Sequence, residues 1–148
     1  MFSTATSNSN SALGALHDKI SFGECSGLNI DGDNEVKGIL GLGGKIQSNS
    51  GDPELILFIK FKEPVNISGI KVDCFEKEFE PEQMQIFANK NNLDFGDIGN
   101  VPSTETVNLK DTFAKLIPLK IAKFRSVNNL IVKNIKNLKF EIYIFLIY

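Results

Sequence analysis

The stretch Asp52–Cys74 constrains the fold most strongly, because its apolar residues alternate as they do along β-strands. The first face of the run carries Leu55, Leu57, Ile59 and Phe61, and the second carries Ile56 and Phe58. Only Lys60 makes the end of the second face polar. A strand that is apolar on both faces is covered on both, so we place this strand in the interior of its sheet.

The same stretch predicts a second strand after a break at Glu63-Pro64, because proline has no N–H to donate to a neighbouring strand. Apolar residues first occur at Val65 and Ile67, and their phase then slips by one at Ser68-Gly69. A slip of one residue at a glycine is typical of a β-bulge. We therefore expect an antiparallel hairpin with a short turn and a bulged second strand.

Chain length and charge limit the classes of function. The 148 residues suit one domain, and the net charge of −2 argues against a nucleic-acid partner, which would favour a basic surface. No apolar run is long enough to cross a membrane, and no secretory signal is visible at the N-terminus, so we expect a cytoplasmic or nuclear protein. Cys25 and Cys74 should be reduced thiols there.

The remaining patterns predict short strands, few helical turns and long polar loops. Residues Met1–Ser11 are polar and are expected to form a disordered tail ahead of one domain over 12–148. The expected strands are Gln83–Ala88, Thr104–Leu109, Leu116–Phe124, Leu130–Lys133 and Phe140–Tyr148. The expected helical segments are Ala12–Ile20, Val36–Leu40 and Asp111–Leu116, and the expected loops are Glu24–Glu35, Gly41–Gly51, Asn89–Ser103 and a turn around Val127.

Short strands separated by turns, with little helix, predict an all-β fold, an antiparallel β-sandwich. A jelly-roll strand order is one of several that the pattern allows.

The sequence contains no complete motif for catalysis, metal binding or phosphate binding. His17 is the only histidine and falls in a predicted surface helix, and the two cysteines form no C-x-x-C pair. The acidic run 31–35 begins like a calcium loop but has Val36 where glycine is needed, and Leu42 where glutamate is needed. The glycine-rich run 38–45 matches neither phosphate-binding pattern. We predict no catalytic, cofactor-binding or metal-binding residues, and a binding module in place of an enzyme.

Four blocks in order carry a resemblance to a known family. They are Glu24-Cys25 followed by Leu28-Asn29, then Asp52–Val65, then Gln85–Asp97, and finally Ile117–Leu130. This series resembles the PITH domain, the proteasome-interacting module at the C-terminus of thioredoxin-like proteins. The resemblance covers about residues 22 to 148. No thioredoxin domain precedes residue 22 in this sequence, so the chain looks more like the stand-alone members of the family.

The resemblance implies a jelly-roll β-sandwich similar to galactose-binding-like domains, without catalytic residues. It also implies a protein partner, the 26S proteasome or a related assembly, with the loop Asn89–Ser103 as the first candidate for contact. The alternative is a small-ligand or carbohydrate-binding module, disfavoured because the chain has no Trp and two Tyr. The family's last two strands are joined by a longer loop than Asn134–Lys139. A shortened C-terminal strand would expose apolar residues at Phe145–Tyr148 and favour association.

Overall fold

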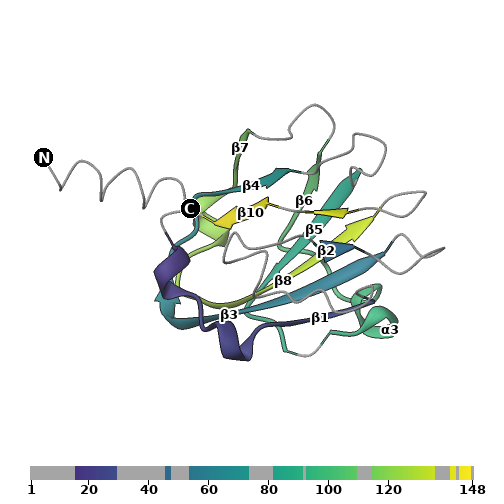
Figure 1. Cartoon of the computed structure of the whole chain (residues 1–148), viewed down its shortest axis with the longest axis horizontal. Coiled ribbons are helices and arrows are strands. Elements are labelled where there is room, and N and C mark those ends of the chain that lie inside the picture. Colours follow the sequence, from purple (N-terminus) through teal and green to yellow (C-terminus); the bar gives the residue numbers. More distant parts are fainter. Residues whose placement is uncertain are drawn as a thin grey trace, which may run out of the picture.

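The computed structural model describes residues 16–29, 46–47, 54–73, 82–91, 93–109, 115–135, 141–142 and 144–147 (Figure 1). The strands are β1 (Ser26–Leu28), β2 (Ile46–Gln47), β3 (Leu55–Val65), β4 (Gly69–Asp73), β5 (Gln83–Ala88), β6 (Glu105–Asn108), β7 (Leu116–Pro118), β8 (Val127–Ile135), β9 (Glu141–Ile142) and β10 (Ile144–Ile147). The helical segments are α3 (Phe95–Ile98) and three 3₁₀ turns, η1 (His17–Lys19), η2 (Phe22–Glu24) and η4 (Ile121–Lys123).

Two antiparallel sheets form the sandwich. The larger has the strand order β1-β3-β8-β5-β6, and the smaller has the order β10-β4-β7. In Figure 1 the long strands β3, β8 and β5 cross the molecule together, with β4 and β7 above them. The strands β2 and β9 form a short separate pair. The expectation of an antiparallel β-sandwich is confirmed.

The alternation of β3 separates two hydrophobic clusters. Its first face enters the main core between the sheets, together with residues from β4, β5, β7 and β8. Its second face, at Ile56 and Phe58, joins a smaller cluster on the outer side of the large sheet, with Phe87 and Ile131. Because β3 also has β1 and β8 as neighbours, its prediction as an interior strand is confirmed.

The predicted hairpin is wrong. β3 and β4 belong to different sheets, and the segment 66–68 crosses from one to the other. Two backbone hydrogen bonds fix this crossing: the Ile67 N–H donates to the Phe124 carbonyl at 3.0 Å, and the Leu119 N–H donates to the Ser68 carbonyl at 2.9 Å. The phase slip at Ser68-Gly69 therefore marks a change of sheet and not a bulge within one strand.

Pro64 does not end β3, because the strand's pairing with β8 is irregular at that place. The register shifts between Lys60 and Val65, whose partners on β8 are Asn129 and Val127. More residues of β3 than of β8 lie between these two pairs, so Pro64 falls where no ladder hydrogen bond is needed.

Several other boundaries need correction. The helix predicted over Ala12–Ile20 is, in its described part, the 3₁₀ turn η1, and Ile20 forms a bridge to Phe61. The predicted loops at Glu24–Glu35, Gly41–Gly51 and Asn89–Ser103 contain β1, β2 and α3, and Val127 begins β8. Leu116 begins the edge strand β7, whose predicted extension to Phe124 is replaced by η4. The tail Met1–Ser11, the turn Val36–Leu40 and residues 110–114 lie outside the described residues.

The other strand predictions are confirmed with small changes. Gln83–Ala88 is β5 at the predicted bounds, and Met84 and Ile86 face the main core. β6 lies inside Thr104–Leu109, with Val107 and Leu109 buried. The single strand predicted over Phe140–Tyr148 needs correction, because the structure has two strands there, β9 and β10, which pair with β2 and β4 respectively in different sheets.

Asparagine side chains tie the end of β5 to the start of β8. Asn89 has a positive φ of 59°. Its Nδ2 donates to the Ser126 carbonyl at 3.1 Å, and its Oδ1 accepts from the Asn128 N–H at 2.7 Å. The Ser126 N–H in turn donates to Asn66 Oδ1 at 3.0 Å, which adds the crossing segment between the sheets. Asparagine suits this position because it tolerates left-handed backbone better than other side chains.

Replacing Asn89 should test that connection. We expect Asn89→Ala to lower the free energy of unfolding by about 1–3 kcal/mol, because it removes two hydrogen bonds and strains the left-handed residue. Asn89→Gly loses the same hydrogen bonds without the strain and should cost less. Urea unfolding followed by circular dichroism measures both. Equal stability of both variants and the parent chain would contradict this role.

Gly69 of β4 lies close against β7. A Cβ there would lie 2.9 Å from the Ile117 carbonyl oxygen, a backbone atom that cannot turn away. We expect Gly69→Ala to destabilise the fold by about 1–3 kcal/mol, despite the lower entropy of its unfolded chain.

Gly99→Ala is the matched control, since its Cβ would meet no heavy atom within 4 Å and its φ is −69°. Its unfolding free energy should stay within about 0.5 kcal/mol of the parent's. Thermal unfolding of the two variants in parallel would reject the packing argument if Gly69→Ala were as stable as the control.

Candidate binding groove

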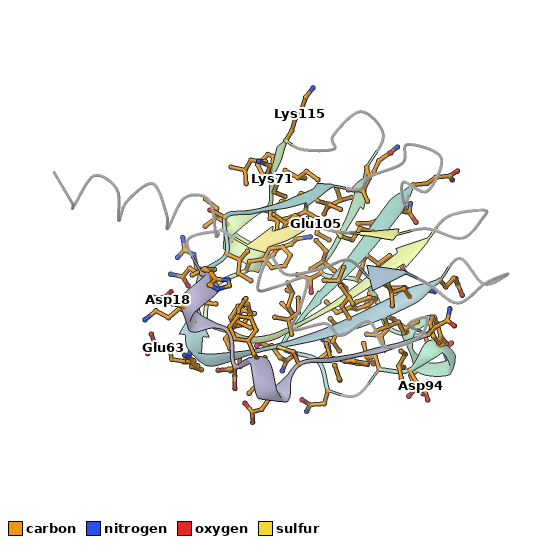
Figure 2. All side chains as sticks on the ribbon, viewed as in Figure 1. Asp18, Glu63, Lys71, Asp94, Glu105 and Lys115 are labelled. Atoms are coloured by element: carbon orange, nitrogen blue, oxygen red, sulfur yellow. The ribbon has the colours of Figure 1, made fainter. Side chains whose placement is uncertain are left out.

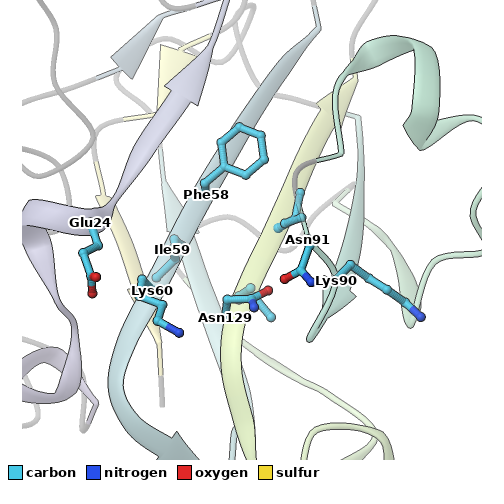
Figure 3. A pocket seen from close by; sticks show the side chains of 9 residues that line it. Glu24, Phe58, Ile59, Lys60, Lys90, Asn91 and Asn129 are labelled. Atoms are coloured by element: carbon cyan, nitrogen blue, oxygen red, sulfur yellow. The ribbon is translucent and has the colours of Figure 1, made fainter.

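A groove of about 280 Å³ opens on the outer face of the large sheet (Figure 3). Its floor contains two cross-strand pairs of β3 and β8: Phe58 opposite Ile131, and Lys60 opposite Asn129. Period-two geometry puts all four side chains on one face, so an apolar pair lies beside a polar pair. The complete lining is Glu24, Phe58, Ile59, Lys60, Lys90, Asn91, Asn129, Leu130 and Ile131.

The two walls of the groove come from segments far apart in the chain. Figure 3 shows Glu24 on one side of the sheet and Lys90 and Asn91 on the other, with β3 and β8 between them. Glu24 ends η2, while Lys90 and Asn91 directly follow β5. Four separate parts of the sequence therefore meet here, each placed by a different pairing in the fold.

Hydrogen bonds along β3 hold the N-terminal wall. The Ser21 N–H donates to the Lys60 carbonyl at 2.8 Å. The Lys60 N–H donates to Cys25 Sγ at 3.5 Å, and this thiol donates to the Ser21 carbonyl at 3.4 Å. Together with the pairing of β1 with β3, these bonds fix the segment that carries Glu24.

Charge in the groove is incompletely paired. The Glu24 carboxylate accepts from Ser21 Oγ at 2.8 Å. Over the described part of the chain, ion pairs join Lys19 to Glu63 at 2.6 Å and Lys133 to Glu54 at 3.3 Å, and neither includes Lys60 or Lys90. Both ammonium groups are therefore available to an anionic group of a ligand.

Asn129 adds an unsatisfied polar atom to the floor. Its Oδ1 is buried and has no hydrogen-bond donor among the described residues. A buried acceptor without a donor costs free energy, so a ligand N–H that reached this carboxamide after a small rotation would be favoured.

The loop Asn89–Ser103 has a structural role as well as a place in the groove. Leu93 and Ile98 are buried in the outer cluster, against Ile56 and Phe87 of the sheet. Its helix α3 is capped by Asp94, whose Oδ1 accepts from the Asp97 N–H at 2.8 Å. Only the first residues, Lys90 and Asn91, line the groove. Substitution at Lys90 therefore tests binding, whereas deletion of the loop would expose the cluster that it covers.

The other residues weighed in the sequence lie elsewhere. His17 packs its ring against Phe22 with 5.3 Å between the ring centroids, and it is not part of the groove lining. Cys25 is a free thiol behind the floor. Within the described ranges there is no cluster of three or more His, Cys, Asp or Glu side chains able to hold a metal ion. No helix in the described part of the chain is long and apolar enough to span a membrane.

The groove itself was missed by sequence reasoning, although one signal was present. Lys60 interrupts the apolar second face of β3, which indicates that the cover of this face stops there. Glu24, Lys90 and Asn129 carry no local pattern that links them to Lys60, because their proximity depends on strand pairing.

Solved structures define the class of the fold. Carbohydrate-binding domains CBM32-1 and CBM32-2 of Clostridium perfringens ZmpB, in complex with GalNAc, align over 89% of this chain and 35% of theirs, with a TM-score of 0.65 and 12% identity. CBM32-3 from a family 31 glycoside hydrolase of the same organism aligns over 90% and 97%, with a TM-score of 0.60 and 11% identity. The chain is thus a jelly-roll β-sandwich of the galactose-binding-like class.

The sequence places the chain more narrowly within that class. Residues 6–138 match the family model of the PITH domain, so the chain belongs to the PITH domain family. A PITH domain-containing protein of Schizosaccharomyces pombe is 29% identical over 89 residues, and PITH domain-containing protein 1 of Dictyostelium discoideum is 32% identical over 81 residues. These alignments cover 57% and 53% of this chain, but only 43% and 40% of the two relatives.

The Cys25 thiol provides a test of the packing behind the floor. Burial raises the pKa of Cys25 above its ordinary value of 9.0. We expect iodoacetamide to alkylate Cys25 about tenfold more slowly in the folded chain than in urea at pH 8, because access and thiolate fraction both fall. Peptide mass spectrometry separates this site from Cys74.

The raised pKa of Cys25 also determines how its contribution to folding stability changes with pH. The unfolded chain releases the thiol proton first, so the contribution of Cys25 to stability is present below pH 9.0 and declines as the pH rises further. Equal alkylation rates in the folded and unfolded chains would contradict the burial of this thiol.

Proposed function

We propose that this chain is a non-catalytic protein-interaction module that docks on the 26S proteasome or a related assembly through the groove. The observation that carries the proposal is the lining: an apolar floor at Phe58 and Ile131 beside two lysines without a described ion pair. An apolar centre with a polar rim is the usual composition of a protein-binding site. Membership of the PITH domain family supports the choice of partner.

The geometry supports recognition of a short segment and not of a broad surface. A groove of about 280 Å³ accommodates one or two side chains of a partner. Phe58 is half-buried and lines the groove, while Lys60 and Lys90 can pair with a carboxylate next to the inserted side chain. Docking of this kind takes place in the cytoplasm or nucleus, where proteasomes work.

Capture of purified 26S proteasomes on the immobilised chain tests the proposal. We expect the immobilised parent chain to capture proteasomes, which are measured by their peptidase activity. The double variant Lys60→Glu/Lys90→Glu should capture at least about tenfold less, because both cations become anions. Lys62→Glu is the control, since Lys62 is exposed on the same strand, carries the same charge and does not line the groove.

The possible results separate two parts of the proposal. No capture by the parent chain, with its β-sheet circular dichroism intact, rejects the proteasome as partner. Capture that is equal for the parent and the double variant rejects the groove as the docking face.

Carbohydrate binding is the second candidate function, favoured by the ring of Phe58 beside polar groups and by the fold of the CBM32 domains. Titration with galactose and GalNAc, followed by protein NMR, distinguishes the two. Shifts confined to the groove residues at millimolar sugar would favour this candidate over protein docking.

A further inference from the structure

The described residues include two exposed large hydrophobic side chains, Leu116 and Ile121, each 54% exposed. Both lie in the segment Lys115–Arg125, KLIPLKIAKFR, which holds four basic residues and no acidic one. The chain as a whole is acidic, with a net charge of −2. Exposed apolar side chains and positive charge therefore occur together in this segment, although the chain as a whole is acidic.

The backbone of this segment is firmly anchored. Ile117, Leu119 and Phe124 are buried in the main core. The Leu119 N–H donates to the Ser68 carbonyl, and the Phe124 carbonyl accepts from the Ile67 N–H. Because these inward residues are fixed, Leu116 and Ile121 are held outward and cannot turn into the core.

A fifth cation joins the segment from the neighbouring strand. Lys71 of β4 lies directly opposite Leu116 of β7, on the outer face of the small sheet. Figure 2 shows Lys71 and Lys115 at the same end of the molecule, around β7. We call the surface formed by Leu116, Ile121 and the cations Lys71, Lys115, Lys120, Lys123 and Arg125 the basic ridge.

Charge on the basic ridge is compensated only in part. Neither ion pair of the described residues involves one of its cations. Glu105 is the neighbouring carboxylate, and its Oε1 accepts from the Lys120 backbone N–H at 2.9 Å. Lys123 Nζ makes one long contact, at 3.4 Å, with the Thr104 carbonyl. Among the described residues of this surface the five cations outnumber the Glu105 carboxylate, which leaves a positive charge.

We propose that the basic ridge is a second docking surface, which binds an acidic peptide segment of a protein partner that carries apolar side chains between its carboxylates. Leu116 and Ile121 contact the apolar side chains, and the surrounding cations pair with the carboxylates. Recognition uses side chains and not strand addition, because the edge strand β7 is short and ends at Pro118, which has no N–H to donate.

A protein partner fits this surface better than an anionic membrane. Membrane binding at an interface needs a wide apolar face together with basic charge. The basic ridge offers only two exposed large apolar side chains among the described residues, which is too narrow a face for insertion at a membrane interface. Leu116 and Lys71 of the ridge lie on β7 and β4 of the small sheet, whereas β3 and β8 of the large sheet form the floor of the groove, so the two proposals can fail separately.

Fluorescence anisotropy with a labelled peptide of alternating glutamate and leucine tests this proposal. We expect saturable binding at low salt that weakens strongly towards about 150 mM NaCl, because exposed charge pairs are screened. Lys115→Glu/Lys120→Glu should raise Kd at least about tenfold, and Leu116→Ser should raise it about threefold without any change in charge. All three side chains are exposed, so the fold should survive.

The matched controls are Lys90→Glu in the groove and Lys62→Glu on β3, which should leave the Kd for this peptide unchanged. A peptide with lysine in place of glutamate should not bind. The proposal is overturned if the parent chain shows no saturable binding up to about 1 mM peptide, or if the ridge variants bind as the parent does. Binding to phosphatidylserine vesicles with no binding to the peptide would overturn it too.

Discussion

The pairing of β3 with β8 is the constraint on which the rest of the structure depends. Both strands are apolar on their two faces, so both faces need cover. The small sheet covers the inner face and completes the main core. On the outer face the segment Leu93–Val101 covers Ile56, Phe87 and Ile131, but this cover stops short of Lys60. The groove is the place where the outer cover ends, and its polar floor at Lys60 and Asn129 is the consequence.

Strand positions could be predicted from the sequence, but strand partners could not. Alternation of apolar and polar residues indicates which face of a strand is buried, and this signal located β3, β5 and β6 correctly. It carries no information on which strand lies alongside, so two consecutive apolar runs were interpreted as a hairpin, although they belong to different sheets. Pro64 strengthened that error, because the irregular register that tolerates it is a property of β8 as much as of β3.

Short and polar elements escaped prediction for a related reason. β1 consists of Ser26, Gly27 and Leu28, whose side chains favour no strand, and it exists because β3 offers it a partner. The polar residues Asn128 and Asn129 suggested a turn, yet they follow Val127 within β8, where the Asn128 N–H donates to Asn89 Oδ1 and the Asn129 carbonyl accepts from the Asn89 N–H. The candidate site was the hardest feature to predict, because its lining comes from four separate segments. Among its residues only Lys60 interrupts a local apolar pattern.

The placement of charge bears on how such a module would find a partner. The chain is acidic overall, whereas the groove and the basic ridge each present lysines without a described ion pair. At distances beyond about 8–10 Å salt screens exposed charges, so the net charge does little to attract or repel a partner. Within contact distance the local cations dominate the electrostatic interaction, and they stabilise an anionic group only when it binds in the correct orientation. Local cations on an acidic chain therefore favour specificity over rapid capture.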